Sequence, residues 1–149
     1  MISSCRNVEI ANMEISGWSG QGIYVEDSMN YSANFTDVYI HDNFFHHNQH
    51  HDGNGYGVES TQGARVLIER NVFDFNRHAI AAGGADGPGG HGNGTGYVAR
   101  HNLVLKGGGF HKRESFPYFS WQTHQFDVHG TVACYEVVNP LCLLVGVPL

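Results

Sequence analysis

The feature that most constrains the fold is a segment that occurs twice, 28 residues apart. The first copy begins at Val38 and reads VYIHDNFFHHN; the second begins at Val66 and reads VLIERNVFDFN. Short runs of alternating apolar and polar residues at a fixed period, with asparagine at the turns, are typical of a solenoid of β-strands. Neither copy shows the helical periodicity of a helix-pair repeat. The repeat therefore predicts an all-β chain, folded as a right-handed parallel β-helix.

Weaker copies extend the pattern in both directions. Val8 and Ile10 correspond to Val38 and Ile40, and a later copy runs from Gly96 to Val104. One coil cannot bury its own apolar face, so successive coils stack, about 4.8 Å apart. The 149 residues provide about four or five coils of one domain. We expect an inward apolar column along the coil axis that consists of Ile40, Ile68 and Ala99. We also expect a column of asparagines at one turn, made of Asn43, Asn71 and Asn102.

The repeat pattern divides the chain into a β-helix over residues 1–131 and an apolar tail over residues 132–149. An open solenoid end exposes unpaired backbone, so the tail is expected to cap that end or to associate with a second copy. We therefore predict a homo-oligomer. The three cysteines, Cys5, Cys134 and Cys142, do not form a disulfide framework, and neither a membrane span nor a signal peptide is evident.

The charge balance limits the partners. A formal net charge of −6 argues against a nucleic-acid partner, which would favour a basic face, and we expect no membrane partner either. An acidic polysaccharide remains compatible, because local arginine and histidine residues can face it. Eleven histidines in 149 residues are the main compositional anomaly.

The repeat alignment also predicts which side chains share a face. If Val58, Ile80 and Phe126 form an inward column, the neighbouring outward columns are Glu59, Ala81, Asp127 and then Thr61, Gly83, His129. The same arithmetic places Tyr56, His78 and His124 in a further inward column. An acid and an imidazole on one exposed strand face, above small residues, suit proton abstraction and return.

The repeats over roughly residues 5–131 resemble the right-handed parallel β-helix proteins related to pectate lyases, with repeats of the type found in carbohydrate-binding proteins and sugar hydrolases. The Asp127-Val128-His129 segment resembles the Asp-Pro-His element of mannuronan C5-epimerases, with valine in place of proline. The resemblance implies a catalytic tyrosine and a basic group beside the acid and the imidazole. Tyr56, Tyr97 and Tyr118 all remain candidates for the tyrosine. By resemblance the protein is extracellular or periplasmic.

Two functions follow as expectations. The first is a lyase or epimerase acting on a uronic-acid polysaccharide, with catalytic Asp127, His129 and His78. Its substrate-binding residues would provide carboxylates, cations and aromatic rings: Glu59, Arg77, Arg100, His124, Tyr118 and Trp121. The alternative is a non-catalytic carbohydrate-binding or structural β-helix, in which the aromatic residues stack on sugar rings.

No cofactor is expected, with a divalent metal as the one exception. The histidine-rich segment after Phe45 offers weak metal candidates: His46, His50, His51 and Asp52. The segment lacks a closed zinc-ligand pattern, and adjacent histidines on an extended strand point to opposite faces. A solvated polar loop is therefore the expected structure.

Overall fold

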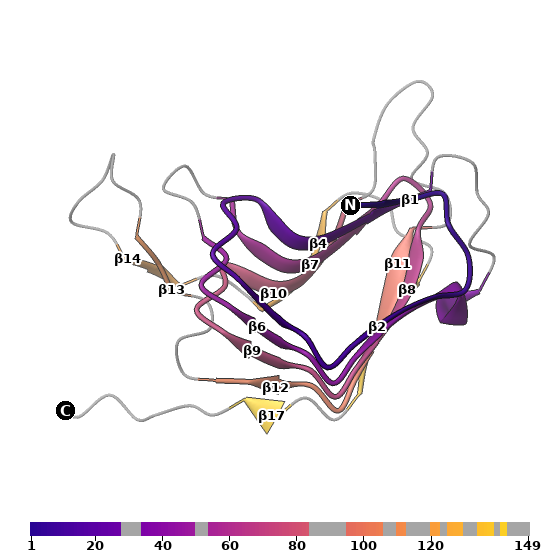
Figure 1. Ribbon diagram of the computed structural model, residues 1–149. Helices are drawn as coiled ribbons and strands as arrows, with labels where there is room; N and C mark the ends of the chain where they lie inside the picture. Colours follow the sequence, from indigo (N-terminus) through magenta and orange to yellow (C-terminus); the bar gives the residue numbers. More distant parts are fainter. Residues whose placement is uncertain are drawn as a thin grey trace, which may run out of the picture.

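The computed structural model describes residues 1–27, 34–49, 54–83, 95–105, 110–112, 120–122, 125–129, 134–138 and 141–142, and describes the backbone alone for residues 110–112, 120–122, 129, 134 and 141–142. Three parallel sheets of five strands each form the sides of a stack of coils (Figure 1). The expected parallel β-helix of four to five coils is confirmed. No helix in this part of the chain is long and apolar enough to span a membrane.

Each sheet takes one strand from every coil. Sheet A contains β1 (Ile2–Ser3), β4 (Gln21–Glu26), β7 (Tyr56–Thr61), β10 (His78–Gly83) and β15 (Phe126–His129). Sheet B contains β2 (Val8–Ala11), β5 (Val38–His41), β8 (Arg65–Glu69), β11 (Gly96–Arg100) and β16 (Cys134–Val138). Sheet C contains β3 (Glu14–Ser16), β6 (Phe44–His46), β9 (Val72–Asp74), β12 (Leu103–Val104) and β17 (Leu141–Cys142).

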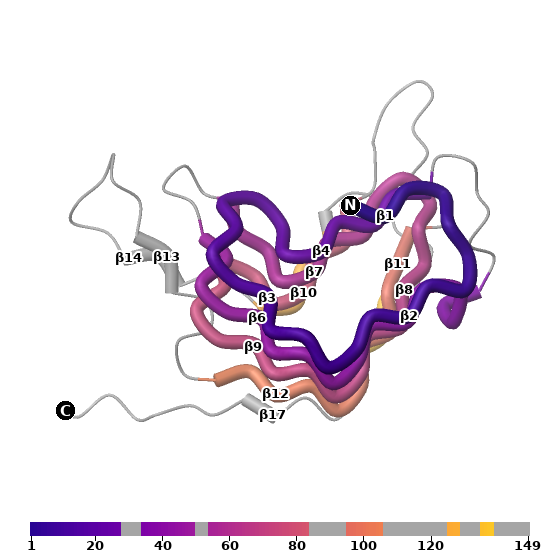
Figure 2. The backbone as a smooth tube through the Cα atoms, in the orientation of Figure 1, coloured from indigo at the N-terminus to yellow at the C-terminus, as the bar shows by residue number. Residues whose placement is uncertain are grey.

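Two smaller elements lie outside these sheets. The strands β13 (Phe110–Lys112) and β14 (Ser120–Gln122) pair antiparallel with each other. A short 3-10 helix, η1 (Phe35–Asp37), directly precedes β5. The backbone trace in Figure 2 shows the coils stacked one behind another from the N-terminal coil onward.

The core is built from columns of equivalent residues. Ile40, Ile68 and Ala99 are register partners on adjacent strands and are at most 1% exposed, as predicted from the repeat. On sheet C, Phe45 and Phe73 are fully buried and stack with ring centroids 5.0 Å apart. Stacking aromatic on aromatic from coil to coil buries area that no single coil could bury.

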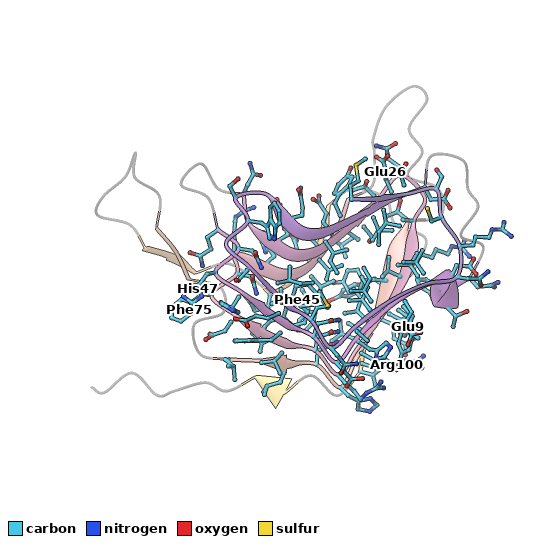
Figure 3. All side chains as sticks on the ribbon, viewed as in Figure 1. Glu9, Glu26, Phe45, His47, Phe75 and Arg100 are labelled. Atoms are coloured by element: carbon cyan, nitrogen blue, oxygen red, sulfur yellow. The ribbon has the colours of Figure 1, made fainter. Side chains whose placement is uncertain are left out.

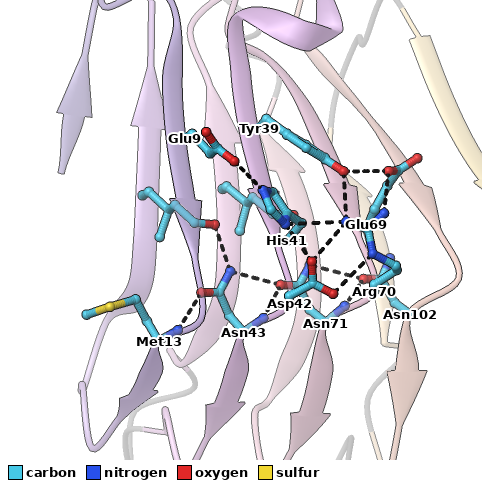
Figure 4. A network of polar contacts seen from close by, with 12 residues as sticks. Glu9, Met13, Tyr39, His41, Asp42, Asn43, Glu69, Arg70, Asn71 and Asn102 are labelled. Atoms are coloured by element: carbon cyan, nitrogen blue, oxygen red, sulfur yellow. Dashed lines mark hydrogen bonds and ion pairs between the residues drawn. The ribbon is translucent and has the colours of Figure 1, made fainter.

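A ladder of asparagines fixes the turn between sheets B and C (Figure 4). The side chain of Asn71 accepts hydrogen bonds from the backbone N–H and the amide of Asn43, both at 3.0 Å. Asn71 in turn donates to Ile40 O at 3.0 Å and to Asn102 Oδ1 at 3.1 Å. The predicted asparagine column is confirmed, and these bonds satisfy backbone groups that the bend removes from the sheets.

The bend itself comes from a left-handed residue before each asparagine. Asp42, Arg70 and His101 have φ values of 54°, 52° and 54°. Three consecutive coils therefore turn at the same position with the same backbone conformation. A second ladder follows sheet C, where Asn48 Nδ2 donates to Asn76 Oδ1 at 2.9 Å.

The tail predicted as residues 132–149 contains two strands that extend the stack. Residues Gly96–Arg100 pair in register with Cys134–Val138, and Leu103–Val104 pair with Leu141–Cys142. Val137 packs against the core cluster, whereas Tyr135 is 48% exposed. These strands are the last in sheets B and C, so part of the tail covers the preceding coil. The predicted homo-oligomer stays a prediction.

A polar network crosses the outer face of sheet B beside the asparagine ladder (Figure 4). His41 lies 2.6 Å from Asp42 through Nδ1 and 2.8 Å from Glu9 through Nε2. Arg70 donates to Asp42 Oδ2 at 2.9 Å and to the Tyr39 hydroxyl at 3.1 Å. The network links three successive coils on the surface.

This network predicts a pH dependence of stability. The hydrogen bond to Asp42 raises the pKa of His41 above 6.5, and Arg70 lowers the pKa of Asp42 from 3.8 to about 2. The His41 contribution is complete below its unfolded pKa and is lost as pH rises through its folded pKa. The Asp42 contribution is present above 3.8 and is lost as pH falls through about 2.

We therefore expect His41→Gln to lower the thermal midpoint more at pH 5 than at pH 9, where only the stacking of the ring on Tyr39 is lost, as measured by circular dichroism. Solvent screening keeps the effect small, because Asp42 and Glu9 are exposed. An equal loss for His41→Gln at pH 5 and pH 9 would contradict this electrostatic origin.

Candidate functional site

The outer face of sheet A carries the site residues predicted from the alignment. The strand register pairs Ala81 with both Glu59 and Asp127, and Gly83 with both Thr61 and His129. Phe126 and Val128 pack against the core, so Asp127 lies between them on the outer side of β15. The predicted outward column of Glu59, Ala81 and Asp127 is therefore present, and Thr61 and Gly83 are in register with the backbone of His129.

The placement of Tyr56 and His78 corrects the sequence analysis, which assigned both to an inward column. Their neighbours Gly57 and Ala79 face the core instead: Ala79 is fully buried in it, and a Cβ on Gly57 would lie 2.8 Å from Phe73. The following residues, Val58 and Ile80, also belong to the core cluster. Two consecutive inward residues shift the alternation, so Tyr56 and His78 lie on the outer side.

An irregular hydrogen-bond pattern produces this shift. The carbonyl of Gly55 accepts from the backbone N–H groups of both Arg77 and His78, at 2.9 and 3.2 Å. One acceptor opposite two donors is a bulge-like arrangement, which re-aims side chains and occurs often beside functional sites. Gly57 is required here, because a Cβ would lie 2.5 Å from the carbonyl oxygen of Ala79.

The re-aimed side chains meet Asp127. The Nε2 atom of His78 lies 3.5 Å from Asp127 Oδ2, and the imidazole stacks on the Tyr56 ring with centroids 5.3 Å apart. Asp127 Oδ1 accepts a hydrogen bond from the Val128 N–H at 2.9 Å. The structure thus brings together two predicted catalytic residues from adjacent strands.

The burial of this pair differs from the expectation. An outward Asp127 was expected on an exposed face, but Asp127 is 5% exposed and His78 is 1% exposed. In a medium of low dielectric constant, the interaction between a carboxylate and an imidazole is stronger than it would be in water. The pair therefore contributes to packing as well as to any chemistry.

A cation lies next to the pair. Arg77 Nη1 donates to the Tyr56 hydroxyl at 3.0 Å, and its guanidinium carbon lies 5.7 Å from the centre of the Tyr56 ring. Burial raises the pKa of Tyr56 above its ordinary value, the charge of Arg77 lowers it, and that of Glu59 raises it. With the pKa raised, Tyr56 holds its proton at neutral pH and can donate it.

Glu59 extends the polar face toward the N-terminal coils. Its side chain accepts a hydrogen bond from Gln21 Nε2, and Thr61 donates to the Tyr24 hydroxyl at 2.8 Å. Gln21, Gly22 and Tyr24 line a cavity of about 440 Å³. Polar and aromatic side chains therefore continue along sheet A from the His78–Asp127 pair to β4.

The remaining predicted site residues fall into three groups. His129 is on β15, where the structure describes its backbone alone. Arg100 lies on sheet B, 3.7 Å from Glu136, and so does not join the sheet A group. Trp121 pairs with His111 in the antiparallel hairpin, where the structure describes the backbone alone. Five predicted residues lie outside the described residues: Tyr118, His124, His50, His51 and Asp52.

The three tyrosine candidates now separate. Tyr56 lies beside His78 and Arg77, whereas Tyr97 is fully buried in the core and donates from its hydroxyl to the Asp127 carbonyl at 3.4 Å. Tyr118 is outside the described residues. Of the two candidates that the structure describes, Tyr56 is the one beside the imidazole. The glycine after Tyr56 was the available sequence signal, since it coincides with the change in alternation.

A family model described as "disaggregatase related" matches residues 5–115. This range covers most of the chain, including β2 to β12 and the residues Tyr56, Arg77 and His78. Asp127 and His129 follow the matched range. Comparison with curated proteins gave no significant match, and neither did comparison with solved structures.

Proposed function

This chain belongs to the disaggregatase-related family, and from that premise we propose that it is a polysaccharide-processing enzyme of the lyase or epimerase type. The substrate would contain uronic acid, and the reaction would begin with removal of the proton next to its carboxylate. The observation that carries the proposal is the continuous set of contacts Arg77–Tyr56–His78–Asp127 on the outer face of sheet A.

Arg77 supplies the charge that this reaction requires. Removing a proton next to a carboxylate places additional negative charge on that group, and a guanidinium binds a carboxylate with two parallel hydrogen bonds. Arg77 is half-buried beside Tyr56, so its charge is less screened than that of a fully exposed arginine. In this proposal Arg77 binds the substrate carboxylate.

Asp127 and His78 act as the base unit. A carboxylate hydrogen-bonded to an imidazole orients the ring and stabilises the imidazolium that forms after proton transfer. Oδ2 and Nε2 lie 3.5 Å apart, so this role requires the buried pair to shorten to hydrogen-bond distance when a substrate binds. His78 would accept the proton, and Asp127 would be a positioning residue.

Tyr56 would return a proton. A tyrosine hydroxyl is protonated at neutral pH, and the hydrogen bond from Arg77 would stabilise the phenolate that remains after the proton is donated. In elimination, the bond from carbon to the glycosidic oxygen breaks, a carbon–carbon double bond forms, and the leaving oxygen takes the tyrosine proton. In epimerisation no bond to oxygen breaks: the tyrosine proton adds to the carbon on the face opposite to the one from which His78 removed its proton.

The test is a panel of uronate polymers, read by ultraviolet absorbance for new double bonds and by proton NMR for epimerised residues. We expect Tyr56→Phe to lower the turnover rate at least about a hundredfold, as loss of a general acid does. The ring stack remains, so the thermal midpoint should change little. His129→Ala is a second variant predicted to lose activity.

The control for this test is Tyr24→Phe, which removes a hydroxyl from β4, one coil from Tyr56 and two coils from His78. Activity should remain close to the wild-type value. If wild-type protein produces no new double bond and no epimerised residue on any polymer of the panel, the enzyme proposal is wrong.

The burial of His78 and Asp127 favours the second candidate, a non-catalytic carbohydrate-binding β-helix. In that case His78→Ala lowers the thermal midpoint and leaves the binding of the polymer intact, because the buried pair contributes to packing. Calorimetric titration with the polymers of the panel separates binding without turnover from catalysis.

A further inference from the structure

Two adjacent imidazoles converge at the end of β6. Consecutive residues of a strand point to opposite faces, which was the expectation for His46 and His47. His47 instead adopts a left-handed backbone conformation, with φ of 54°. The two Nδ1 atoms therefore share a hydrogen bond at 2.8 Å, and the ring centroids are 5.1 Å apart.

Both rings are held by further contacts. His46 Nε2 lies 2.8 Å from Glu14 Oε1, on the strand of the preceding coil. His47 stacks on Phe75 of the following coil, with centroids 4.8 Å apart (Figure 3). The contact with Glu14 places the ring proton of neutral His46 on Nε2, which leaves the Nδ1 lone pair directed toward His47.

This arrangement matches that of metal-binding histidines. Such a histidine usually donates its second ring N–H to a carboxylate, which fixes the tautomer and makes the ligating nitrogen more basic. Glu14 provides that contact for His46. A metal bound by both Nδ1 atoms would displace the proton that they share in the hydrogen bond.

The hydrogen-bonded separation of the two nitrogens is close to that of adjacent ligands in one metal geometry. Nitrogens about 2.0 Å from a metal are about 2.8 Å apart at a right angle and about 3.3 Å apart in a tetrahedron. The observed Nδ1–Nδ1 distance is 2.8 Å. Right-angled nitrogen ligands are typical of square-planar copper(II) and nickel(II), whereas zinc(II) prefers tetrahedral sites.

We propose that His46 Nδ1 and His47 Nδ1 bind copper(II) as two adjacent ligands of a square-planar site, with Glu14 as a positioning residue. The described residues contain no group of three or more His, Cys, Asp or Glu side chains that could hold a metal. Water or solutes therefore complete the coordination. The site lies on sheet C, apart from the sheet A residues, and is independent of the proposed activity.

The test is titration of the untagged protein with copper(II) and with zinc(II) at pH 7.5, followed by calorimetry and by electron paramagnetic resonance of the copper form. Cys5 is exposed and would react with copper, so the protein carries Cys5→Ser. We expect one copper(II) per chain with hyperfine splitting from two imidazole nitrogens, bound at least about tenfold more tightly than zinc(II).

The variants separate ligands from the positioning residue. His46→Ala and His47→Ala should each abolish the two-nitrogen signal, and Glu14→Gln should weaken copper binding about tenfold while retaining that signal. His41→Ala, which removes a histidine held by two carboxylates on sheet B, should bind copper as the wild type does. Unchanged copper binding in His46→Ala or His47→Ala, or equal affinity for zinc and copper, would overturn the proposal.

Discussion

Replacing Ile68 by aspartate is expected to abolish folding. Ile68 is fully buried between its register partners Ile40 and Ala99, and no water reaches this column. Burying a charged or unbonded carboxyl group there costs several kcal/mol, and a domain of this size is stable by only about 5–15 kcal/mol. The result would be seen as loss of the β-sheet circular dichroism signal and of soluble protein.

The preceding residue provides the matched control. Leu67 lies on the same strand, β8, but on the opposite face, where it is half-buried. Leu67→Asp should therefore fold, with a small loss of stability. A folded Ile68→Asp protein, or equal damage from both substitutions, would mean that the column is not the interior of the stack.

Asn71→Leu is expected to lower the free energy of unfolding by about 3 kcal/mol or more. The substitution removes the acceptor of the Asn43 N–H and amide bonds, and the donor to Ile40 O and Asn102 Oδ1. Each buried polar group left without its bond costs about 1–3 kcal/mol. Urea unfolding followed by circular dichroism measures the difference.

Asn71→Asp distinguishes loss of the ladder from loss of packing. The aspartate keeps an acceptor for Asn43 but, when ionised, cannot donate to Ile40 O. Its destabilisation should therefore decrease when the pH is lowered from 7 to 4, because protonation restores one donor. For Asn71→Leu the loss should be the same at both pH values, and the opposite pattern would contradict a ladder role.

The sequence was sufficient to predict the columns of this fold. A coil of nearly constant length repeats the same apolar and polar positions, so Ile68 could be aligned with Ile40 and Asn71 with Asn43 from their spacing alone. The register of β7, β10 and β15 was also predictable, because strand alternation has a period of two. Each of these predictions depends on local periodicity.

The candidate site was only partly predictable from the same alignment. It placed Asp127 one coil from His78, and the structure brings their side chains to 3.5 Å. The alternation rule nevertheless gave His78 the wrong face, since one carbonyl accepting from two N–H groups shifts the phase of β10. The alignment also did not decide which of three tyrosines lies beside the acid and the imidazole, and in the structure Tyr56 is the neighbour of His78.

What the sequence determined by itself was the architecture: a parallel β-helix with a buried apolar column and an asparagine ladder. The tertiary structure alone decided where side chains depart from the repeat, at Tyr56 and His78 on sheet A and at His46 and His47 on sheet C. The physical reason is the same in both places. Strand alternation is a regular property of extended backbone, whereas a bulge or a left-handed residue such as His47 breaks it at one position. These breaks form between stacked coils, through hydrogen bonds and ring contacts that the linear repeat does not encode.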